Sequence, residues 1–427
     1  MDDIKVGRLN NGLKYLINTN KCATNTNIYY FIRVGSKHEK ENESGMAHFL
    51  EHMLFKGTEN YKSNIELNEK IDDLAASTNA STMKNMTSYY LKLPNENVIE
   101  GIKLLTDMVF FSTIKGNELE KEKDVVFEEI NKTFDDSENF IEDLLSYYLF
   151  KDSKLQHYIM GEKKILEKMK RKDLLSFYKR YYIPSNSILV ISGNVPKNLA
   201  KNLSKFINFK SNTNKIIHNY DLHCFSKKVK IVSVNRNHFQ ITIGIAFPLF
   251  NCFDKRRFLL DILIAHFDGL LTSKLWIELR ENNGLVYGAD ANYELFEEGG
   301  IFQIIYSLEK KNVFKSIELI RKIIDDFKNR KIKNEEFERY KNFIIKNVDI
   351  EKEDNLEVSN FYGEQYLFSD NLVTHSQLKE KYLKYNLDEL YDLADFIFDY
   401  NKMTIIQIGD IKNKIFSKKT KKIFDFI

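Results

Sequence analysis

The feature that most constrains this chain is a segment of helical pattern, residues 45–58, which carries two histidines and a glutamate on one face. The apolar side of this helix is formed by Met46, Phe49, Leu50, Met53 and Leu54. Side chains three and four positions apart share one face of a helix, so His48, Glu51 and His52 project together. Two imidazoles at this spacing can bind one zinc ion, and the carboxylate can accept a proton from water at the metal. The order His-x-x-Glu-His is that of an inverted zinc-peptidase motif.

Taken alone, the motif has a simpler alternative, in which the two histidines merely cap a buried helix. A catalytic zinc site needs a third protein ligand. The strongly helical segment 117–134 could supply it, because Glu122 and Glu129 lie two turns apart on one face. The buried side of this segment is expected to hold Leu119, Val126, Ile130 and Phe134. Most acidic residues on a helix are simply solvated, so the third ligand stays open at this point.

A possible binding edge lies between these two helices. A second helix is expected over residues 64–74, followed by the polar segment Ser77–Thr82 and an alternating strand over residues 87–93. We expect Asn79 and its neighbours to form an edge strand, where an extended peptide could add itself as a further strand. An ordinary polar turn explains the same residues equally well.

Length and charge limit the class of protein. A chain of 427 residues is too long for one hydrophobic core, so two or more domains are expected. The chain has 64 Lys and Arg against 61 Asp and Glu, a net charge of +3. This balance lacks the excess of basic residues typical of nucleic-acid-binding proteins, so no nucleic-acid partner is expected. No run of about 18 apolar residues is present to span a bilayer, so no membrane partner is expected.

The cysteines indicate the compartment. Cys22, Cys224 and Cys252 are odd in number and far apart, so neither a disulfide framework nor a thiolate metal site is expected. Free thiols suit a reducing compartment. The first residues lack both a signal peptide and a basic amphipathic leader. We therefore expect a cytoplasmic protein, or one of an organelle matrix if a leader has been removed.

The order of predicted elements is the same in both halves. The first half starts with strands, where Asn10-Asn11-Gly12 forms a hairpin turn, and continues with helices. The polar run 210–219 reads as a linker, which divides the chain into domains 1–210 and 220–427. The second half again begins with strands and returns to helices from Arg257 onward.

The second half lacks the zinc motif. Its counterpart segment, residues 261–269, contains a single histidine, His266, which is expected to be a packed core residue. A second motif follows at residues 279–288, where a helix ends near Glu281 and a Gly turn leads into a strand. That geometry brings Arg280 and Tyr287 to one edge, where they could grip a peptide carbonyl or stabilise its oxyanion. A surface arginine and a half-buried strand tyrosine are the alternative reading.

Three segments together resemble one known family: residues 45–58, residues 79–82 and the stretch from Glu122 to Ile130. They are similar to the M16 (pitrilysin/insulinase) metallopeptidases, above all to the short bacterial members and the mitochondrial processing peptidases. The resemblance implies an α+β fold of two structurally similar domains, each an antiparallel-rich sheet flanked by helices. Such a chain would be one half of the clamshell that the long family members form.

The resemblance also assigns roles at the metal. It implies that His48, His52 and Glu129 bind one zinc ion per chain, and that Glu51 is the general base. Glu122 matches an outer-shell glutamate of the family. Glu129 lies 77 positions after His52, close to the family spacing, while its neighbour Glu128 remains an alternative ligand.

Further residues match positions that handle the substrate. Asn79 and Ala80 match residues that hold the substrate backbone. Arg280 and Tyr287 match a pair that serves the peptide near the zinc from the opposing half of the clamshell. Asn85 departs from the family, which usually has a glutamate there.

Because the resemblance makes this chain one half of a clamshell, it also implies a second chain. Because the chain has both the zinc motif and the Arg/Tyr pair, a homodimer is expected, with Arg280 and Tyr287 acting in trans, and a heterodimer with a homologous subunit is the alternative. The expected activity is zinc-dependent endoproteolysis of unstructured peptides or presequence-like segments in an enclosed chamber. Two other readings are a partner-dependent subunit that matures one specific peptide and a non-catalytic structural homologue.

Overall fold

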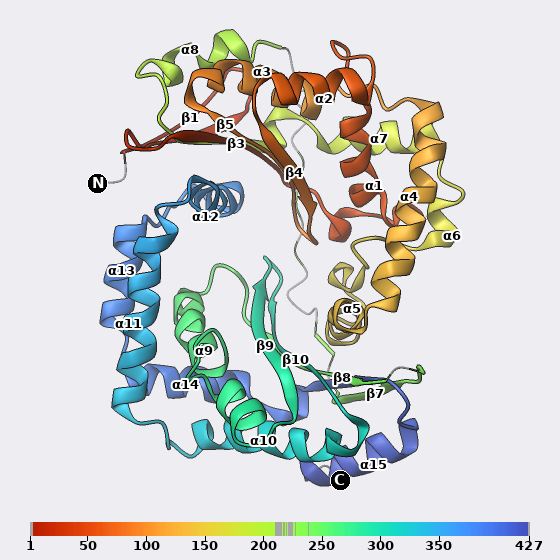
Figure 1. Cartoon of the computed structure of the whole chain (residues 1–427), viewed down its shortest axis with the longest axis vertical. Helices are drawn as coiled ribbons and strands as arrows, with labels where there is room; N and C mark the ends of the chain where they lie inside the picture. The colour runs from red at the N-terminus through yellow and green to blue at the C-terminus, as the bar shows by residue number, and fades with distance from the viewer. Residues whose placement is uncertain are drawn as a thin grey trace. The chain divides into compact units, whose positions relative to one another are not determined.

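The structure is a computed structural model that describes residues 3–209, 216, 218, 220, 225–226, 228–237 and 239–425. The chain forms two compact units (Figure 1). The first comprises Met1–Ile130, His157–His218 and Asp349–Gln377, and the second Asn131–Gln156, Asn219–Val348 and Leu378–Ile427. Most of the predicted linker, residues 210–219, lies outside the described residues.

The first unit is built on a six-stranded sheet with the order β1-β2-β6-β3-β5-β4. Its strands are β1 (Asp3–Arg8), β2 (Lys14–Thr19), β3 (Asn25–Ile32), β4 (Ser77–Thr82), β5 (Thr87–Pro94) and β6 (Ser187–Gly193). The predicted hairpin joins β1 and β2, and Gly12 supplies the positive φ of 93° that its turn requires. β2 and β6 are parallel, whereas every other pair is antiparallel. The predicted edge strand is confirmed, because β4 ends the sheet and pairs with β5.

Helices cover both faces of this sheet. The helices of the first unit are α1 (Met46–Met53), α2 (Asn64–Asp73), α3 (Val98–Phe110), most of α4 (Gly116–Asp135), α6 (Lys163–Leu166), α7 (Arg171–Tyr181), α8 (Leu199–Phe206) and α12 (Asn355–Phe368). In Figure 1, α3 lies on one face of β3 and α12 on the other. α12 approaches closely at Gly363, where a Cβ would lie 2.1 Å from the ring of Phe31.

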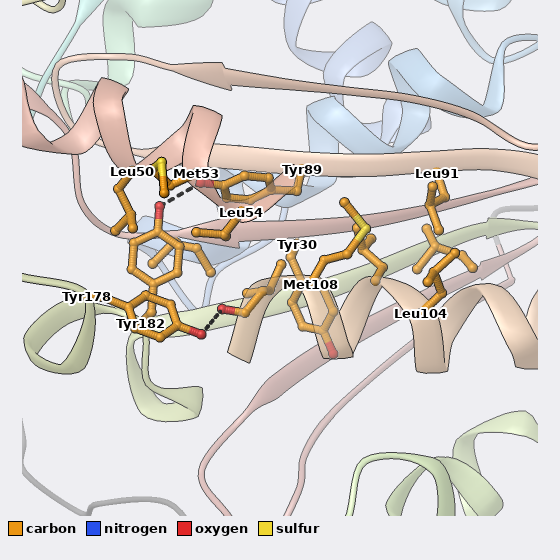
Figure 2. Packing of buried hydrophobic residues seen from close by; sticks show 14 of the residues in the cluster. Tyr30, Leu50, Met53, Leu54, Tyr89, Leu91, Leu104, Met108, Tyr178 and Tyr182 are labelled. Carbon is orange, nitrogen blue, oxygen red and sulfur yellow. Dashed lines mark hydrogen bonds between the residues drawn. The ribbon is translucent and has the colours of Figure 1, made fainter. Parts of the chain in front are cut away.

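The core of the first unit lies between the sheet and α1, α3 and α7. Figure 2 shows Tyr89 of β5 beside Leu50, Met53 and Leu54 of the α1 segment, with its hydroxyl bonded to that of Tyr182 at 2.7 Å. α1 is therefore fixed by apolar packing on the side away from its polar residues. The predicted buried side of α4 is correct for Leu119, Val126 and Ile130. It is wrong for Phe134, which is 37% exposed and packs against the ring of Phe140 at a tilt near the end of the helix.

The second unit repeats this plan with five strands in the order β7-β11-β8-β10-β9. These are β7 (Lys230–Val234), β8 (Ile241–Leu249), β9 (Val286–Leu295), β10 (Gly300–Leu308) and β11 (Thr404–Ile408). Its helices are α5 (Ser137–Leu149), α9 (Leu259–Phe267), α10 (Val313–Lys328), α11 (Asn334–Glu351, up to Val348 in this unit), α13 (His375–Lys384), most of which belongs here, α14 (Leu387–Ile397) and α15 (Asn413–Ile423).

Apart from β1, which has no counterpart in the second sheet as described, the two sheets match strand for strand. The order β2-β6-β3-β5-β4 corresponds to β7-β11-β8-β10-β9, and the parallel pairs β2–β6 and β7–β11 occupy the same place in it. The predicted fold class, α+β with two structurally similar domains, is therefore confirmed. α9 occupies the place in the second unit that α1 occupies in the first. Along the chain, α1 lies between β3 and the edge strand β4, and α9 lies between β8 and the edge strand β9.

The units exchange segments of the chain. α5 of the first half packs on β8, β10 and β11, and α12 of the second half packs on β3 and β6. The domains predicted from the sequence, residues 1–210 and 220–427, differ from the compact units by these two segments. Within the described residues, no helix combines the length and the apolar character that crossing a membrane requires.

Candidate metal centre

The helix with the histidines begins at a buried carboxylate. Gly45, with a φ of 87°, precedes α1, and a Cβ there would lie 2.6 Å from the carbonyl oxygen of Met160. Glu39 is fully buried, and its two oxygens accept the backbone N–H groups of Gly45 and Ala47, both at 2.8 Å. These bonds satisfy two of the N–H groups that a helix leaves without intrahelical partners. Glu39 thus helps to set where α1 begins, two residues before His48.

Three side chains converge between α1, which carries His48 and His52, and α4, which carries Glu129. The ligating atoms of His48, His52 and Glu129 all lie within 4.8 Å of one another. The Glu129 carboxylate is 3.7 Å from Nε2 of His48 and 3.2 Å from Nε2 of His52. Glu128, the alternative ligand, is exposed and stands outside this group.

A chain of polar contacts orients the second histidine. Nδ1 of His52 lies 3.0 Å from Oε1 of Glu122, whose other oxygen is 2.6 Å from the ammonium group of Lys56. If Nδ1 donates its hydrogen to this carboxylate, the lone pair of Nε2 is left for a metal. Glu122 is buried, and the ion pair with Lys56 compensates its charge there.

The two imidazoles differ in their affinity for a proton. Burial, with the nearby His52, lowers the pKa of His48 to about 4. Burial also acts to lower the pKa of His52, but hydrogen bonds to Glu122 and Glu129 outweigh it and raise that pKa to about 9. A cation is therefore favoured between His52 and Glu129. A metal ion would take the place of the proton there.

The donor set fits zinc. Two imidazole nitrogens and one carboxylate oxygen are the ligands of catalytic zinc sites, which leave a fourth position open. The side chain of Glu129 is 40% exposed, so the group is accessible from solvent. His48, His52 and Glu129 are the residues that would hold the ion.

The motif glutamate is anchored by the edge strand. Oε2 of Glu51 accepts a hydrogen bond from the hydroxyl group of Thr82, the last residue of β4, at 2.5 Å. Burial raises the pKa of Glu51, and the Thr82 hydrogen bond opposes this shift. The carboxylate lies one turn along α1 from His48 and beside His52, on the face that the sequence pattern predicts.

The predicted substrate-binding residues lie on the same strand. Asn79 is exposed, Ala80 is half-buried, and the side-chain oxygen of Asn79 accepts the N–H of Ala80 at 2.9 Å. Asn85, the departure from the family pattern, is buried between β4 and β5.

Arg280 and Tyr287 belong to the second unit. Arg280 is the last residue but one of a short π-helix, Trp276–Glu281, and donates a hydrogen bond to the backbone oxygen of Tyr287 at 2.9 Å. Its guanidinium group stacks 4.0 Å from the ring centroid of Trp276, while Tyr287 is 87% exposed. The pair lies together as the motif predicts, and its approach to the zinc-binding residues stays a prediction.

The counterpart histidine in α9 has a different setting. His266 is 1% exposed and packs against the rings of Phe267, Phe327 and Tyr340. It is a packed core residue, as the sequence analysis expected.

Three residues that support the candidate metal centre were not predicted from the sequence. Lys56 carries a signal that could have been used, since it follows His52 by four positions and continues the helical face toward Glu122. Thr82 lay within a segment whose resemblance was noted, but its contact with Glu51 joins residues 31 positions apart. Glu39 acts from an irregular loop, for which periodicity gives no signal.

Comparisons with known proteins agree with this geometry. The family model described as "Insulinase (Peptidase family M16)" matches residues 15–163, and the one described as "Peptidase M16 inactive domain" matches residues 168–344. A protein of Bacillus subtilis named "Uncharacterized zinc protease YmxG" is 28% identical over 330 residues, which cover 77% of this chain and 79% of the relative. The "Probable mitochondrial-processing peptidase subunit beta, mitochondrial" of Arabidopsis thaliana is 30% identical over 193 residues, or 45% of this chain and 36% of the relative.

Solved structures share the fold. A protease from Helicobacter pylori superposes with a TM-score of 0.87 at 20% identity, covering 96% of this chain and all of the other. An M16-like peptidase from Alicyclobacillus acidocaldarius gives 0.83 at 19% identity, covering 96% of this chain and 99% of the other. Together the two family models span most of the chain, and the chain belongs to the M16 (insulinase) family of peptidases.

Proposed function

We propose that this protein is a zinc-dependent endopeptidase that cleaves unstructured peptides or presequence-like segments. The observation that carries the proposal is the convergence of His48, His52 and Glu129, with Glu51 projecting from the same helix. Relatives named as zinc proteases support the choice of metal and of reaction.

In the proposed mechanism, each side chain has one task. Zinc held by His48, His52 and Glu129 would supply a Lewis acid for the scissile carbonyl and for the attacking water. Glu51 accepts the proton of that water and passes it to the leaving amine. Glu122 holds the imidazole of His52 in orientation, and Lys56 compensates the charge of Glu122.

The substrate is proposed to lie extended along β4. Its backbone would pair with the edge at Asn79 and Ala80, which requires a segment without structure of its own. Arg280 and Tyr287 would contact the same peptide, since an arginine donor and a phenol hydroxyl suit a carbonyl oxygen. The exposed ring of Tyr287 is available for such a contact.

Hydrolysis of a quenched, unstructured peptide tests the proposal, with purified wild type and Glu51→Gln compared and the zinc content of both determined. We expect wild type to cleave the peptide, and the variant to retain zinc while its kcat falls by about 10²-fold or more. Zinc-loaded wild type that cleaves nothing in a broad peptide pool would refute a stand-alone peptidase.

We also propose that two copies of the chain assemble and that Arg280 and Tyr287 act in trans. The support is that one chain carries both the metal-binding residues and the Arg/Tyr motif. Mixing Glu51→Gln with Arg280→Ala subunits tests this directly. In trans, the zinc site of the second variant is completed by the arginine of the first, so activity returns in the mixture. In cis, the mixture stays as inactive as its components.

A partner-dependent processing subunit is the second candidate. The similarity to a mitochondrial-processing peptidase subunit favours it. It predicts that the purified chain binds zinc, stays inactive and gains activity with a homologous subunit. A non-catalytic structural homologue is disfavoured, because a complete set of zinc ligands and the motif glutamate are present. We propose a reducing compartment such as the cytoplasm, because the three cysteines are odd in number and far apart in the sequence and so suggest no disulfide framework.

A further inference from the structure

One hydrogen bond from the described residues holds the side chain of Glu51, the glutamate of the zinc-binding motif. Within the described part of the chain, the hydroxyl group of Thr82 is the one hydrogen-bond donor to the side chain of Glu51. An ionised carboxylate accepts hydrogen bonds in several directions, so one donor decides where it points. The rings of Tyr89 and Tyr182 lie nearby, but their hydroxyl groups bond to each other.

Thr82 is itself held firmly. It is 9% exposed and pairs with Thr87 of β5 at the end of β4. The turn beyond it is closed by the N–H of Met83, which donates to the oxygen of Met86 at 2.8 Å. A β-branched side chain has few accessible rotamers, so the hydroxyl group is presented to Glu51 with little loss of freedom.

The same strand is the proposed substrate edge. Residues of β4 alternate between its two faces, and Thr78, Ala80 and Thr82 form the less exposed face. Ala80 packs against the core that includes α1, two residues before Thr82. Asn79 lies on the exposed face of this strand. A peptide that pairs with β4 therefore stiffens the strand that carries the anchor of Glu51.

We infer that Thr82 is a positioning residue, which holds the Glu51 carboxylate in place for the attacking water and couples it to the strand that binds the peptide. This inference rests on the proposed peptidase function. The hydroxyl group of Thr82 donates to Glu51, which is not one of the predicted zinc ligands His48, His52 and Glu129, so its loss should leave the metal in place.

The test compares Thr82→Val, which keeps the shape and removes the donor, with Thr82→Ser, which keeps the donor. We expect Thr82→Val to lower kcat about tenfold or more, with KM changed less than about twofold, while Thr82→Ser stays within about threefold of wild type. Zinc content should be equal in all three proteins. Crystal structures should place the Glu51 carboxylate as in wild type for Thr82→Ser and displaced for Thr82→Val.

Two results would overturn the inference. One is a Thr82→Val enzyme with wild-type kcat and an unmoved Glu51. The other is a loss of activity that Thr82→Ser shares or that follows loss of zinc, since both describe a structural role. An inactive wild type would instead count against the proposed function, and the position of Glu51 in the variant structures would still decide on the role of Thr82.

Discussion

Replacing Glu39 by glutamine tests whether the helix with the zinc motif depends on one buried carboxylate. Each oxygen of Glu39 accepts one backbone N–H, from Gly45 and from Ala47. A glutamine has one acceptor oxygen, so one N–H loses its partner and faces a donor. An unsatisfied buried N–H costs about 1–3 kcal/mol, and the remaining bond loses about 1 kcal/mol of charge assistance.

An opposing effect reduces this cost. Burial raises the pKa of Glu39 well above its usual value, because removing a charged carboxylate from water costs free energy in the folded protein. A neutral glutamine does not have this desolvation cost, so we expect a net loss of about 2 kcal/mol of unfolding free energy. For a folded unit of this size the loss corresponds to a midpoint lower by about 4–8 °C.

Circular dichroism during heating of the metal-free protein measures this shift, and competition with a chromogenic chelator measures zinc affinity. Affinity should fall too, because a frayed helix start displaces His48. Glu41→Gln is the matched control, since it makes the same charge change on an exposed residue of the same loop. Equal midpoints and equal zinc affinity in the two variants would refute the role of Glu39.

Two further predictions follow from the structure. Glu129→Gln should fail to retain zinc after dialysis while Glu128→Gln retains it, as metal analysis of both proteins would reveal; the opposite pattern would move the third ligand to Glu128. Burial raises the pKa of Glu364 to about 7, so its contribution to stability is present below about pH 4.5 and lost as the pH rises through 7. Glu364→Gln should therefore gain at most about 3 kcal/mol at pH 8 and little at pH 5 in urea unfolding, and an equal change at both pH values would contradict this.

Local patterns predicted the elements that surround the metal. The spacing of His48, Glu51 and His52 predicted their common face, because that face depends on helix periodicity alone. The edge strand over Ser77–Thr82 was one of two interpretations, since a polar turn explained the same residues equally well. The choice between Glu128 and Glu129 needed tertiary structure, since the two differ by about a quarter of a helical turn. The structure brings Glu129 to the histidines and leaves Glu128 exposed.

The exchange of α5 and α12 could not be predicted. Both helices have apolar residues that must be buried against a sheet, and the sequence pattern does not indicate which of the two sheets each helix packs on. α12 covers the first sheet, where Phe31 leaves room only for the hydrogen of Gly363. That complementarity joins residues more than 300 positions apart, which periodicity cannot detect.

The duplicated fold explains why the site depends on residues outside the motif. α9 holds the place of α1 in the second unit, and its His266 is packed among aromatic rings, where burial lowers its pKa well below the usual value. α1 instead carries two histidines and a carboxylate beside the core of the first unit, and the partial burial of these polar groups costs free energy of desolvation. Glu39, Lys56 and Thr82 provide partners for the helix start, for the orienting glutamate and for the base. Lys56 and Thr82 act through single side-chain contacts in the described structure, so we expect their conservative replacements to alter metal binding or catalysis more than the fold, whereas Glu39 accepts two backbone N–H groups and also stabilises the helix.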